Sequence, residues 1–305
     1  MIIAIDNGNA NTKTVHHVFT SGLTMHDVKP PMSDELIKFK GKYYTLSSTR
    51  LPYSRDKTKG ISCFILSLFG IAKELLEEKM PTEDIDIDLA VGLPPEHYGT
   101  LKDKFRDYFL SFGSKVDFTY NEIPFSINLR TVNVFPQAFA AVLSKSSNLK
   151  SYSRTYVIDI GGYTTDILLL SNGKPDLSYC RSLEIGIIKM NNIIKGRISK
   201  AYDMQIEDEH IYDVLSNRKT ILSEEVKENI REEAAKHTET ILNNMRELGI
   251  DLKSNPAIFA GGGALLLKPF LEASEKTATI EFLPDISSNA VGYTILDTAK
   301  LKFGK

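Results

Sequence analysis

Residues 157–170, which read VIDIGGYTTDILLL, constrain the fold of this chain more than any other stretch. β-Branched and leucine side chains, which favour strands, lie on both sides of a glycine pair, Gly161 and Gly162. Glycine lets the backbone reverse tightly, so the pattern predicts two strands joined by a short turn. We therefore expect a β-hairpin with strands over residues 155–160 and 165–170.

The turn of this hairpin is bordered by Asp159 and carries hydroxyl groups. Glycines have no Cβ, so an anion can approach backbone N–H groups that donate to phosphate oxygens. Asp159 itself repels phosphate, but a Mg²⁺ ion between the two reverses the sign of the interaction. The pattern suggests a site for a metal-bound nucleotide. For this stretch alone, an ordinary hairpin whose polar turn faces water remains the alternative.

A turn of the same kind lies near the start of the chain. A strand-like segment over residues 2–5 is followed by the polar turn DNGNANTK at residues 6–13, and a second strand is expected from residues 14–15. Thr12 and Lys13 can contact phosphate oxygens. If the two hairpins face one another, they can hold a triphosphate, with a Mg²⁺ shared by Asp6 and Asp159 mainly through its waters. The alternative for Asp6 and Lys13 is a solvated turn with a surface ion pair, which contributes little stability.

Three consecutive glycines, at residues 261–263, stand between a predicted strand at residues 256–260 and a predicted helix at residues 264–273. Their backbone can lie flat against a planar ring or a ribose-phosphate, and the N-terminus of the helix favours phosphate. A tight strand-to-helix turn needs only one such glycine. Three in succession therefore favour a ligand.

Residues 135–143 predict a helix whose first turn contains Pro136. Gln137 would then lie near the N-terminus of this helix. An uncharged amide in that place can orient a water molecule for attack on a γ-phosphate. The alternative is a glutamine whose amide is satisfied by solvent.

The composition limits the class of protein. With 305 residues, of which 42% are hydrophobic, the chain can bury a sizeable core, and a typical size of about 150 residues per domain gives two domains. The net charge is −2 and lysine and arginine form no dense run, so direct binding of nucleic acid is not expected.

Cys63 and Cys180 lack the spacing of a disulfide framework or a zinc site, which fits a reducing cytoplasm. The sequence begins with a strand-like segment and no basic leader, and its apolar run over residues 61–72 is too short to span a bilayer. We therefore expect a soluble, cytoplasmic protein that does not contact a membrane.

Periodicity predicts the remaining elements. The sequences GxxxxGK[ST] and GxGxxG are absent, which excludes P-loop and common dinucleotide-binding folds. Helices are expected from residue 62 to a point before Pro81 and over residues 101–109, 187–198, 223–248 and 289–301. Strands are expected over residues 36–39, 42–46, 85–93, 116–118, 125–133, 177–184 and 279–283.

Taken together, these motifs resemble those of the actin-like ATPase superfamily over nearly the entire chain. Residues 6–13 resemble its first phosphate motif, residues 136–138 its first connecting helix, residues 159–166 its second phosphate motif and residues 260–263 its adenosine motif. Within the superfamily, VGLPP at 91–95 and NAVGY at 289–293 look most like the ParM-type plasmid-segregation actins.

The resemblance implies an α/β, actin-like (ribonuclease H-like) ATPase fold with two domains, each a mixed sheet flanked by helices, and a central nucleotide cleft. Domain I would comprise residues 1–153 plus 284–305, and domain II residues 154–283. The implied cofactors are ATP or GTP with Mg²⁺. The implied activity is nucleotide hydrolysis coupled to polymerisation into filaments of the chain itself, which segregate plasmid DNA through a DNA-binding adaptor of the ParR type.

The resemblance also implies roles for individual residues. Asp6 and Asp159 would hold the waters of the Mg²⁺, and Gln137, with Asp159, would act on the attacking water. Gln137 departs from the ParM-type pattern, in which glutamate is more common, and this puts the rate of hydrolysis in question. The implied nucleotide contacts are Asn7, Gly8, Asn11, Thr12, Lys13, Gly161, Gly162, Tyr163, Thr164, Gly261, Gly262 and Gly263, with Asn191 or Asn192 at the ribose or base.

Two other functions fit the same scaffold. A metabolic kinase would need a base beside an acceptor pocket, and no residue of the sequence can be nominated for it. A chaperone-like nucleotide switch that does not polymerise would need an added substrate-binding domain, for which the sequence offers no segment.

Overall fold

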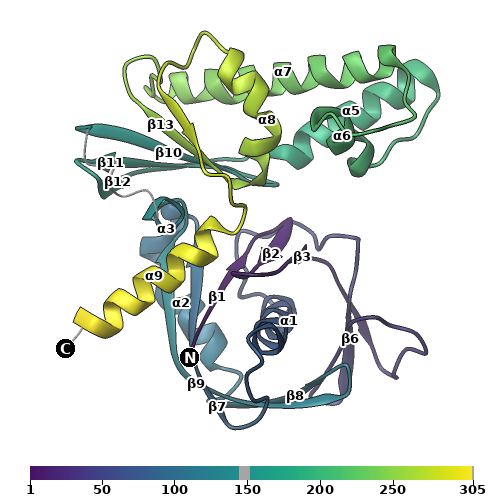
Figure 1. The fold of residues 1–305 in the computed structure, drawn as a ribbon, viewed down its shortest axis with the longest axis vertical. Coiled ribbons are helices and arrows are strands. Elements are labelled where there is room, and N and C mark those ends of the chain that lie inside the picture. Colours follow the sequence, from purple (N-terminus) through teal and green to yellow (C-terminus); the bar gives the residue numbers. More distant parts are fainter. Residues whose placement is uncertain (144–151, 304–305) are drawn as a thin grey trace. The chain divides into compact units, whose positions relative to one another are not determined.

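The structure, a computed structural model, describes residues 1–143 and 152–303, with side chains described up to residue 300. The chain divides into two compact units, which we call unit 1 (Met1–Ser144 and Ser287–Lys305) and unit 2 (Lys145–Ile286). Each unit contains one mixed β-sheet flanked by helices (Figure 1). The predicted α/β class and the mixed sheets are confirmed.

Unit 1 contains a nine-stranded sheet in the order β3-β2-β1-β7-β9-β8-β5-β6-β4. Strands β1, β7 and β9 pair in parallel, and the other pairs are antiparallel. The strands are β1 (Ile2–Asn7), β2 (Asn11–Lys13), β3 (Val18–Thr20), β4 (Leu23–His26), β5 (Leu36–Phe39), β6 (Lys42–Leu46), β7 (Ile85–Leu93), β8 (Lys115–Tyr120) and β9 (Ile123–Pro136).

The two ends of this sheet are joined by only two residues. Ser21 and Gly22 separate β3 from β4, which stand at opposite ends of the strand order. Nine strands spaced about 4.8 Å apart would be about 40 Å wide if flat, whereas two residues reach only about 7 Å, so the sheet must curve back on itself. Helix α1 (Ser62–Glu77) lies inside the curve (Figure 1).

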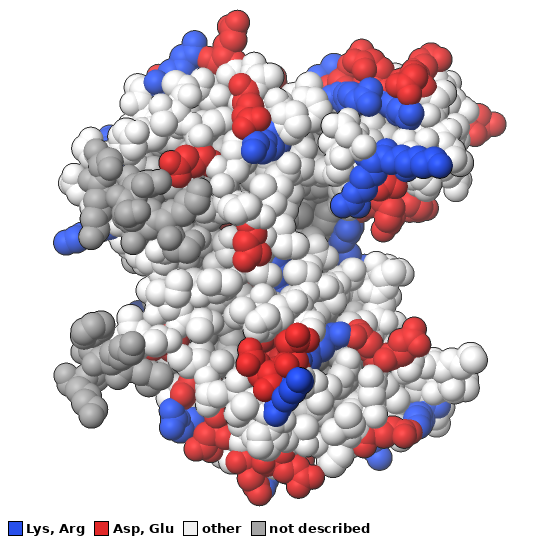
Figure 2. Space-filling view, in the orientation of Figure 1, with Lys and Arg blue, Asp and Glu red and all other residues white. Residues whose placement is uncertain are grey.

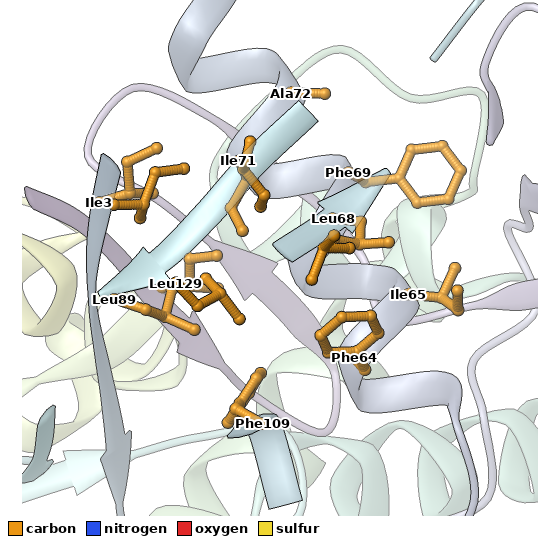
Figure 3. Close-up of a cluster of buried hydrophobic side chains, with 14 of the residues drawn as sticks. Ile3, Phe64, Ile65, Leu68, Phe69, Ile71, Ala72, Leu89, Phe109 and Leu129 are labelled. Atoms are coloured by element: carbon orange, nitrogen blue, oxygen red, sulfur yellow. The ribbon is translucent and has the colours of Figure 1, made fainter. Parts of the chain in front are cut away.

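The main core of unit 1 fills the space between this helix and the sheet. Side chains of α1, of β1, β7 and β9, and of α2 (Pro95–Leu110) interdigitate there (Figure 3). On β1 the side chains of Ile3 and Ile5 belong to this core, while Ala4, between them, points to the opposite face. The alternation is what a strand with both faces buried requires.

The opposite face of the sheet carries small residues, so a helix can approach it closely. Helix α9 (Ser288–Phe303) packs there on β1, β7 and the short helix α3 (Phe139–Val142). A Cβ added at Gly292 of α9 would lie 1.9 Å from the backbone oxygen of Ala140, and one added at Gly92 would lie 1.9 Å from the hydroxyl of Tyr293. Glycine is therefore required at both positions.

Unit 2 contains a five-stranded sheet in the order β12-β11-β10-β13-β14. The predicted hairpin is confirmed as β10 and β11, with Ile160 opposite Thr165. Helices α5 to α8 form a layer in which α8 packs directly on β10, β13 and β14, and α7 packs on the other three helices. The elements are β10 (Arg154–Ile160), β11 (Thr165–Ser171), β12 (Lys174–Leu183), α5 (Ile187–Tyr202), α6 (Asp208–Leu215), α7 (Glu224–Glu247), β13 (Ala257–Ala260), α8 (Gly261–Ala273) and β14 (Ile280–Phe282).

The predicted helix over residues 135–143 is wrong in its first half. Strand β9 continues to Pro136, because Phe135 and Pro136 lie opposite Gly92 and Leu93 of the parallel strand β7. The helix that follows has only four residues. Gln137 therefore lies in the turn between β9 and α3 and not in a helix.

Other boundaries also differ from the sequence prediction. Helix α2 begins at Pro95, with proline at the first helical position, where its missing N–H costs nothing. Helix α8 begins at Gly261, so the glycine triplet forms its first turn. The short elements β3, β4 and α6 were not predicted.

On the face shown in Figure 2, lysine and arginine side chains are interspersed with acidic ones over both units. In the part of the chain that the structure describes, no helix combines the length and the apolar character needed to cross a bilayer.

We predict that Gly292→Ala lowers the free energy of unfolding by at least about 2 kcal/mol, because the added methyl group meets backbone that cannot move aside. Urea unfolding followed by circular dichroism measures the change. Gly99→Ala is the matched control, since Gly99 lies in α2 of the same unit with open space around its Cα, and it should stabilise by about 0.5–1 kcal/mol. Equal behaviour of the two variants would contradict the close approach of α9.

Candidate functional site

In unit 1, β1 and β2 form a hairpin as predicted, but β2 (Asn11–Lys13) lies within the predicted turn and ends before the predicted second strand at residues 14–15. Asp6 lies opposite Lys13, and Asn7 lies opposite Thr12. The N–H of Gly8 donates to the backbone oxygen of Asp6 at 2.9 Å. A Cβ added at Gly8 would lie 2.4 Å from the oxygen of Asn11, so the close approach of the two strands requires glycine there.

The carboxylate of Asp6 is buried, with 2% of the residue exposed. The Nε2 of Gln137 donates to its Oδ1 at 2.6 Å, and the Nδ2 of Asn289 lies 3.5 Å from its Oδ2. The Nζ of Lys13 lies 3.8 Å from the same Oδ2. A buried carboxylate is costly unless it is paired and hydrogen-bonded, and these three groups supply the pairing. The alternative of a solvated turn with a surface ion pair does not describe Asp6.

Gln137 is presented by a strained turn. Ala138, the next residue, has φ 60° and ψ −54°, and the N–H of Phe139 donates to the oxygen of Gln137 at 2.5 Å. This is a γ-turn with positive φ, a rare conformation that costs about 1–3 kcal/mol in a residue other than glycine. The surrounding contacts must outweigh that cost. The N–H of Gln137 donates to Leu93 at 2.9 Å, and that of Ala138 to the Oδ1 of Asn289 at 3.0 Å.

A cavity of about 190 Å³ lies beside the same hairpin and within unit 1. Its lining includes Asn7, Gly8, Lys57 and Cys63. The Nζ of Lys57 donates to the backbone oxygen of Asn7. The Nδ2 of Asn7 donates to Ser67 at 2.9 Å, while its Oδ1 is buried without a hydrogen-bond partner among the described residues. Through its bond to the Asn7 backbone, Lys57 places a positive charge beside the hairpin.

Lys57 and Asn289 are residues of the site that the sequence analysis did not assign. Lys57 stands in residues 18–60, where no chemistry was expected, and nothing in its local sequence indicates the hairpin. Asn289 was noted only as part of the closing helix. A signal for it did exist, since the small residues Ala290 and Gly292 beside it indicate a helix that packs closely.

In unit 2, the turn of the β10–β11 hairpin is fixed by helix α5. The N–H of Gly161 donates to Thr164 at 2.8 Å, which closes the turn. The first N–H groups of α5, from Ile187 and Ile188, donate to the oxygens of Gly161 and Gly162 at 3.1 and 2.8 Å. Helix N-termini leave such donors without partners inside the helix, and here the turn supplies the acceptors.

Gly161, Gly162, Tyr163 and Thr164 are partly exposed in this turn. The hydroxyl of Thr164 donates to Asp166 at 3.1 Å. Asp166 is buried, and it also accepts from Ser182 at 2.5 Å. Asp159 is partly exposed at the end of β10. The turn thus combines an accessible carboxylate, Asp159, with glycine backbone.

The glycine triplet packs against the end of β10. A Cβ added at Gly261, whose φ is +87°, would lie 2.3 Å from the Oδ1 of Asp159, and one added at Gly263 would lie 2.6 Å from the oxygen of Ile160. Packing alone therefore requires two of the three glycines, which revises the argument that three in succession favour a ligand. Only Gly262 is exposed and surrounded by open space, with its nearest neighbour at 3.9 Å.

Asn191 lies in α5, the helix on which it was expected. It is fully buried, and its Nδ2 donates to the hydroxyl of Tyr212 in α6 at 3.0 Å. Its Oδ1 is buried without a hydrogen-bond partner among the described residues, and its contact with a ribose or base stays a prediction. Asn192, the alternative, is exposed on the same helix.

The donor set fits a nucleotide-bound Mg²⁺ better than a metal held by protein ligands alone. Among residues 1–143 and 152–303, no group of three or more His, Cys, Asp or Glu side chains could hold a metal ion. Mg²⁺ commonly keeps several waters and binds through one or two carboxylates together with substrate phosphates. Unit 1 offers one such carboxylate at Asp6, and unit 2 offers another at Asp159.

We predict that Gly261→Ala lowers the free energy of unfolding by at least about 2 kcal/mol, because it combines a positive φ with a steric clash against Asp159. Gly262→Ala, its neighbour, should unfold like the unaltered protein. Urea unfolding of both variants checks this. A Gly262→Ala variant that folds normally but binds nucleotide more weakly would identify Gly262 as the glycine that the ligand approaches.

His237 of α7 gives unit 2 a predicted pH dependence. Burial lowers its pKa to about 4 from 6.5, nearby Lys189 adds to the effect, and a hydrogen bond with the Gly186 backbone opposes it. The folded protein then binds the proton less tightly than the unfolded chain. The free energy of unfolding should fall between pH 6.5 and 4, by up to about 1.4 kcal/mol per pH unit, and should not depend on this group above pH 6.5.

Replacement of this histidine should flatten the profile. His237→Gln cannot take up a proton, so its urea unfolding should vary less over that interval than that of the unaltered protein. His97→Gln, on α2 of unit 1, is the control for the loss of a histidine. Identical slopes for the unaltered protein and His237→Gln would contradict the lowered pKa.

Two sequence families match the chain. The family described as "Actin like proteins N terminal domain" matches residues 4–139, which include Asp6 and Gln137. The family described as "Archaeal actin homologue MreB-like, C-terminal" matches residues 157–273, which include Asp159 and the glycine triplet. Among curated proteins, no sequence matches the chain.

Solved structures of actin homologues share the fold. The archaeal actin homolog Ta0583 has a TM-score of 0.77 at 19% identity, covering 98% of this chain and 99% of its own, and a crystal structure of Ta0583 in complex with ADP has a TM-score of 0.73 at 20% identity with the same coverage. The apo psk41 ParM protein has a TM-score of 0.70 at 19% identity, covering 100% and 99%. The Alp12 filament structure has a TM-score of 0.68 at 14% identity, covering 98% of both chains.

At these identities the structures establish the fold, and the two sequence families match successive parts of the chain. They agree with the resemblance noted in the sequence. The chain belongs to the actin-like ATPase superfamily.

Proposed function

We propose that the protein binds ATP or GTP with Mg²⁺, hydrolyses it, and assembles with copies of itself into filaments in a nucleotide-dependent manner. The observation that carries this proposal is the contact between Gln137 and Asp6: a buried carboxylate at the end of β1, hydrogen-bonded by an amide that a strained turn presents. Strain of this kind persists where the surrounding structure enforces it, and it is concentrated at functional sites.

The groups in each unit have separate roles in this proposal. In unit 1, Lys13, Lys57 and the N–H groups of the hairpin bind phosphate oxygens. In unit 2, the glycine turn and Gly262 contribute backbone contacts. Asp6 and Asp159 accept hydrogen bonds from the waters of Mg²⁺, which when bound neutralises the charge that develops on the phosphates.

Gln137 orients the attacking water in this proposal. Its Nε2 is directed to a carboxylate that can only accept, so its Oε1 remains available to accept a hydrogen bond from water. An amide does not take up a proton at neutral pH. The proton of the water must therefore pass to phosphate or solvent, which distinguishes this chain from relatives with glutamate in the same place.

Self-assembly is supported by two observations. The Alp12 structure and the AlfA structure bound to AMPPNP, which are similar to this chain at 14% and 16% identity, are described as filaments. In unit 1, Met25, Val28 and Met32, on β4 and the loop after it, are 59%, 76% and 92% exposed. Exposed apolar side chains in one segment suit a contact between copies.

We extend the proposal to plasmid segregation. On the face shown in Figure 2, lysine and arginine side chains are interspersed with acidic ones. Direct binding of DNA usually requires a basic face, so we propose that the chain reaches the plasmid through a DNA-binding adaptor of the ParR type.

Light scattering and sedimentation test assembly. The full chain, with Mg²⁺ and either ATP or GTP, should scatter strongly above a critical concentration and sediment, and EDTA should prevent both. A chain that remains monomeric at high concentration with both nucleotides but hydrolyses them would support a soluble enzyme or a nucleotide switch on the same scaffold instead.

Substitution of Asp159 tests the site itself. We predict that Asp159→Ala abolishes phosphate release, because a carboxylate that holds the waters of Mg²⁺ is lost, while urea unfolding changes little. Asp159→Asn, which keeps the volume, should be equally inactive. Glu228→Ala removes an exposed acid from α7 of the same unit and is the matched control. Unchanged turnover in both Asp159 variants would refute the assigned site.

A further inference from the structure

Asn289 joins three parts of unit 1 that lie far apart in the sequence. It stands in the first turn of α9, it is buried with 6% exposure, and its amide carries one acceptor and one donor group. The Oδ1 accepts from the N–H of Ala138 at 3.0 Å, and the Nδ2 lies 3.5 Å from the Oδ2 of Asp6. One side chain thus contacts both the turn that presents Gln137 and the carboxylate to which Gln137 is bonded.

We propose that Asn289 is a positioning residue for the hydrolysis proposed above, which holds the amide of Gln137 and the carboxylate of Asp6 in a fixed relation. The inference rests on the proposed function, in which Gln137 orients the attacking water and Asp6 contacts the waters of Mg²⁺. Asn289 contacts neither the nucleotide nor the water. It acts through Gln137 and Asp6, which contact the waters of the site in the proposed function.

The backbone of Ala138 explains why such a residue is needed. A γ-turn with positive φ does not persist by itself in a residue with a side chain. The bond from Ala138 to Asn289 ties the turn to α9, which packs on β1 and β7 and, at Gly292, against the backbone of Ala140 in α3. Without this bond the turn can relax. Gln137 is the residue before Ala138, so its side-chain amide then moves with the turn.

The contact with Asp6 adds a second constraint. The two oxygens of this carboxylate are contacted by different amides, Oδ1 by Gln137 and Oδ2 by Asn289. Contacts to both oxygens restrict rotation of a carboxylate, and the Nζ of Lys13 also lies near Oδ2, at 3.8 Å. An oriented carboxylate presents its remaining lone pairs in a defined direction, which is what a contact with metal-bound water requires.

Three variants of the full chain test the proposal. Asn289→Ala removes both contacts, and Asn289→Asp keeps an oxygen that can accept from Ala138 but loses the donor to Asp6. Asn133→Ala is the matched control: the Nδ2 of Asn133 on β9 donates to Asp297 on α9 at 2.6 Å, so it also ties α9 to the sheet through an amide, but it has no contact with Asp6 or Gln137.

The first measurement needs no nucleotide. Amide hydrogen exchange at Ala138, followed by NMR, should be about 100-fold faster in Asn289→Ala than in the unaltered protein, because the acceptor of this N–H is removed. It should be close to the unaltered rate in Asn289→Asp and in Asn133→Ala. Equal protection of this amide in Asn289→Ala would overturn the claim that Asn289 holds the turn.

The second measurement is steady-state hydrolysis. In Asn289→Ala, kcat should fall by about 100-fold with KM changed by less than about threefold, since misplacement of the water affects the reaction and not the binding of nucleotide. Asn289→Asp should also lose kcat while keeping protection at Ala138. Asn133→Ala should keep kcat even where its stability is reduced.

The outcomes separate this inference from the proposed function. If the unaltered protein hydrolyses nucleotide and Asn289→Ala has the same kcat, or if Asn133→Ala loses kcat equally, the positioning role is wrong and the function stands. If Asn289→Ala does not fold, the kcat of Asn289→Asp decides, and an unchanged value overturns the inference. If the unaltered protein hydrolyses neither ATP nor GTP, the proposed function is wrong, and the role of Asn289 in hydrolysis is wrong with it.

Discussion

The buried carboxylate of Asp6 is the constraint around which unit 1 is arranged. A charge removed from water at the end of a central strand requires partners, and its partners come from three segments: Lys13 on the next strand, Gln137 on the turn after β9, and Asn289 at the start of α9. Each must reach the same point. The parallel pairing of β1, β7 and β9 brings the turn there, and the small residues on the outer face of the sheet let α9 come close enough for an amide to contact the strand end.

In both units, glycine allows a helix to approach another backbone segment closely. Gly292 lies against Ala140 in unit 1, and Gly186 and Gly261 lie against the hairpin turn and Asp159 in unit 2. These glycines place a helix N-terminus directly beside the end of a strand that carries an acid. Two segments that bind phosphate in other proteins, a glycine-rich turn and the start of a helix, are therefore held rigidly by packing before any ligand arrives. Tight backbone contacts therefore preorganise these segments in addition to the polar contacts around Asp6.

Much of this could be predicted from the sequence, because the signals are local. The two hairpins, the strand before the glycine triplet and the long helix capped by Ser223 follow from side-chain type, glycine and capping chemistry within a few residues. The errors arose where pairing with a distant segment decides the structure. Phe135 and Pro136 remain in a strand because β7 lies beside them. Lys57 was missed for the same reason, and the small residues beside Asn289 indicate a closely packed helix but not the carboxylate that Asn289 contacts.

Unit 1 is built from both ends of the chain, and this has a consequence for its biosynthesis. Asp6 and Asn289 are 283 residues apart, so the amide that contacts the carboxylate leaves the ribosome long after the strand that carries it. At about 5–20 residues per second, the nascent N-terminal segment waits on the order of tens of seconds for its last helix. Unit 2, which is continuous in the sequence, can fold completely in that interval. A chain that is released before residue 289 carries a folded unit 2 and an Asp6 that lacks the contact with Asn289. The full set of contacts to Asp6 therefore forms only after α9 has been synthesised.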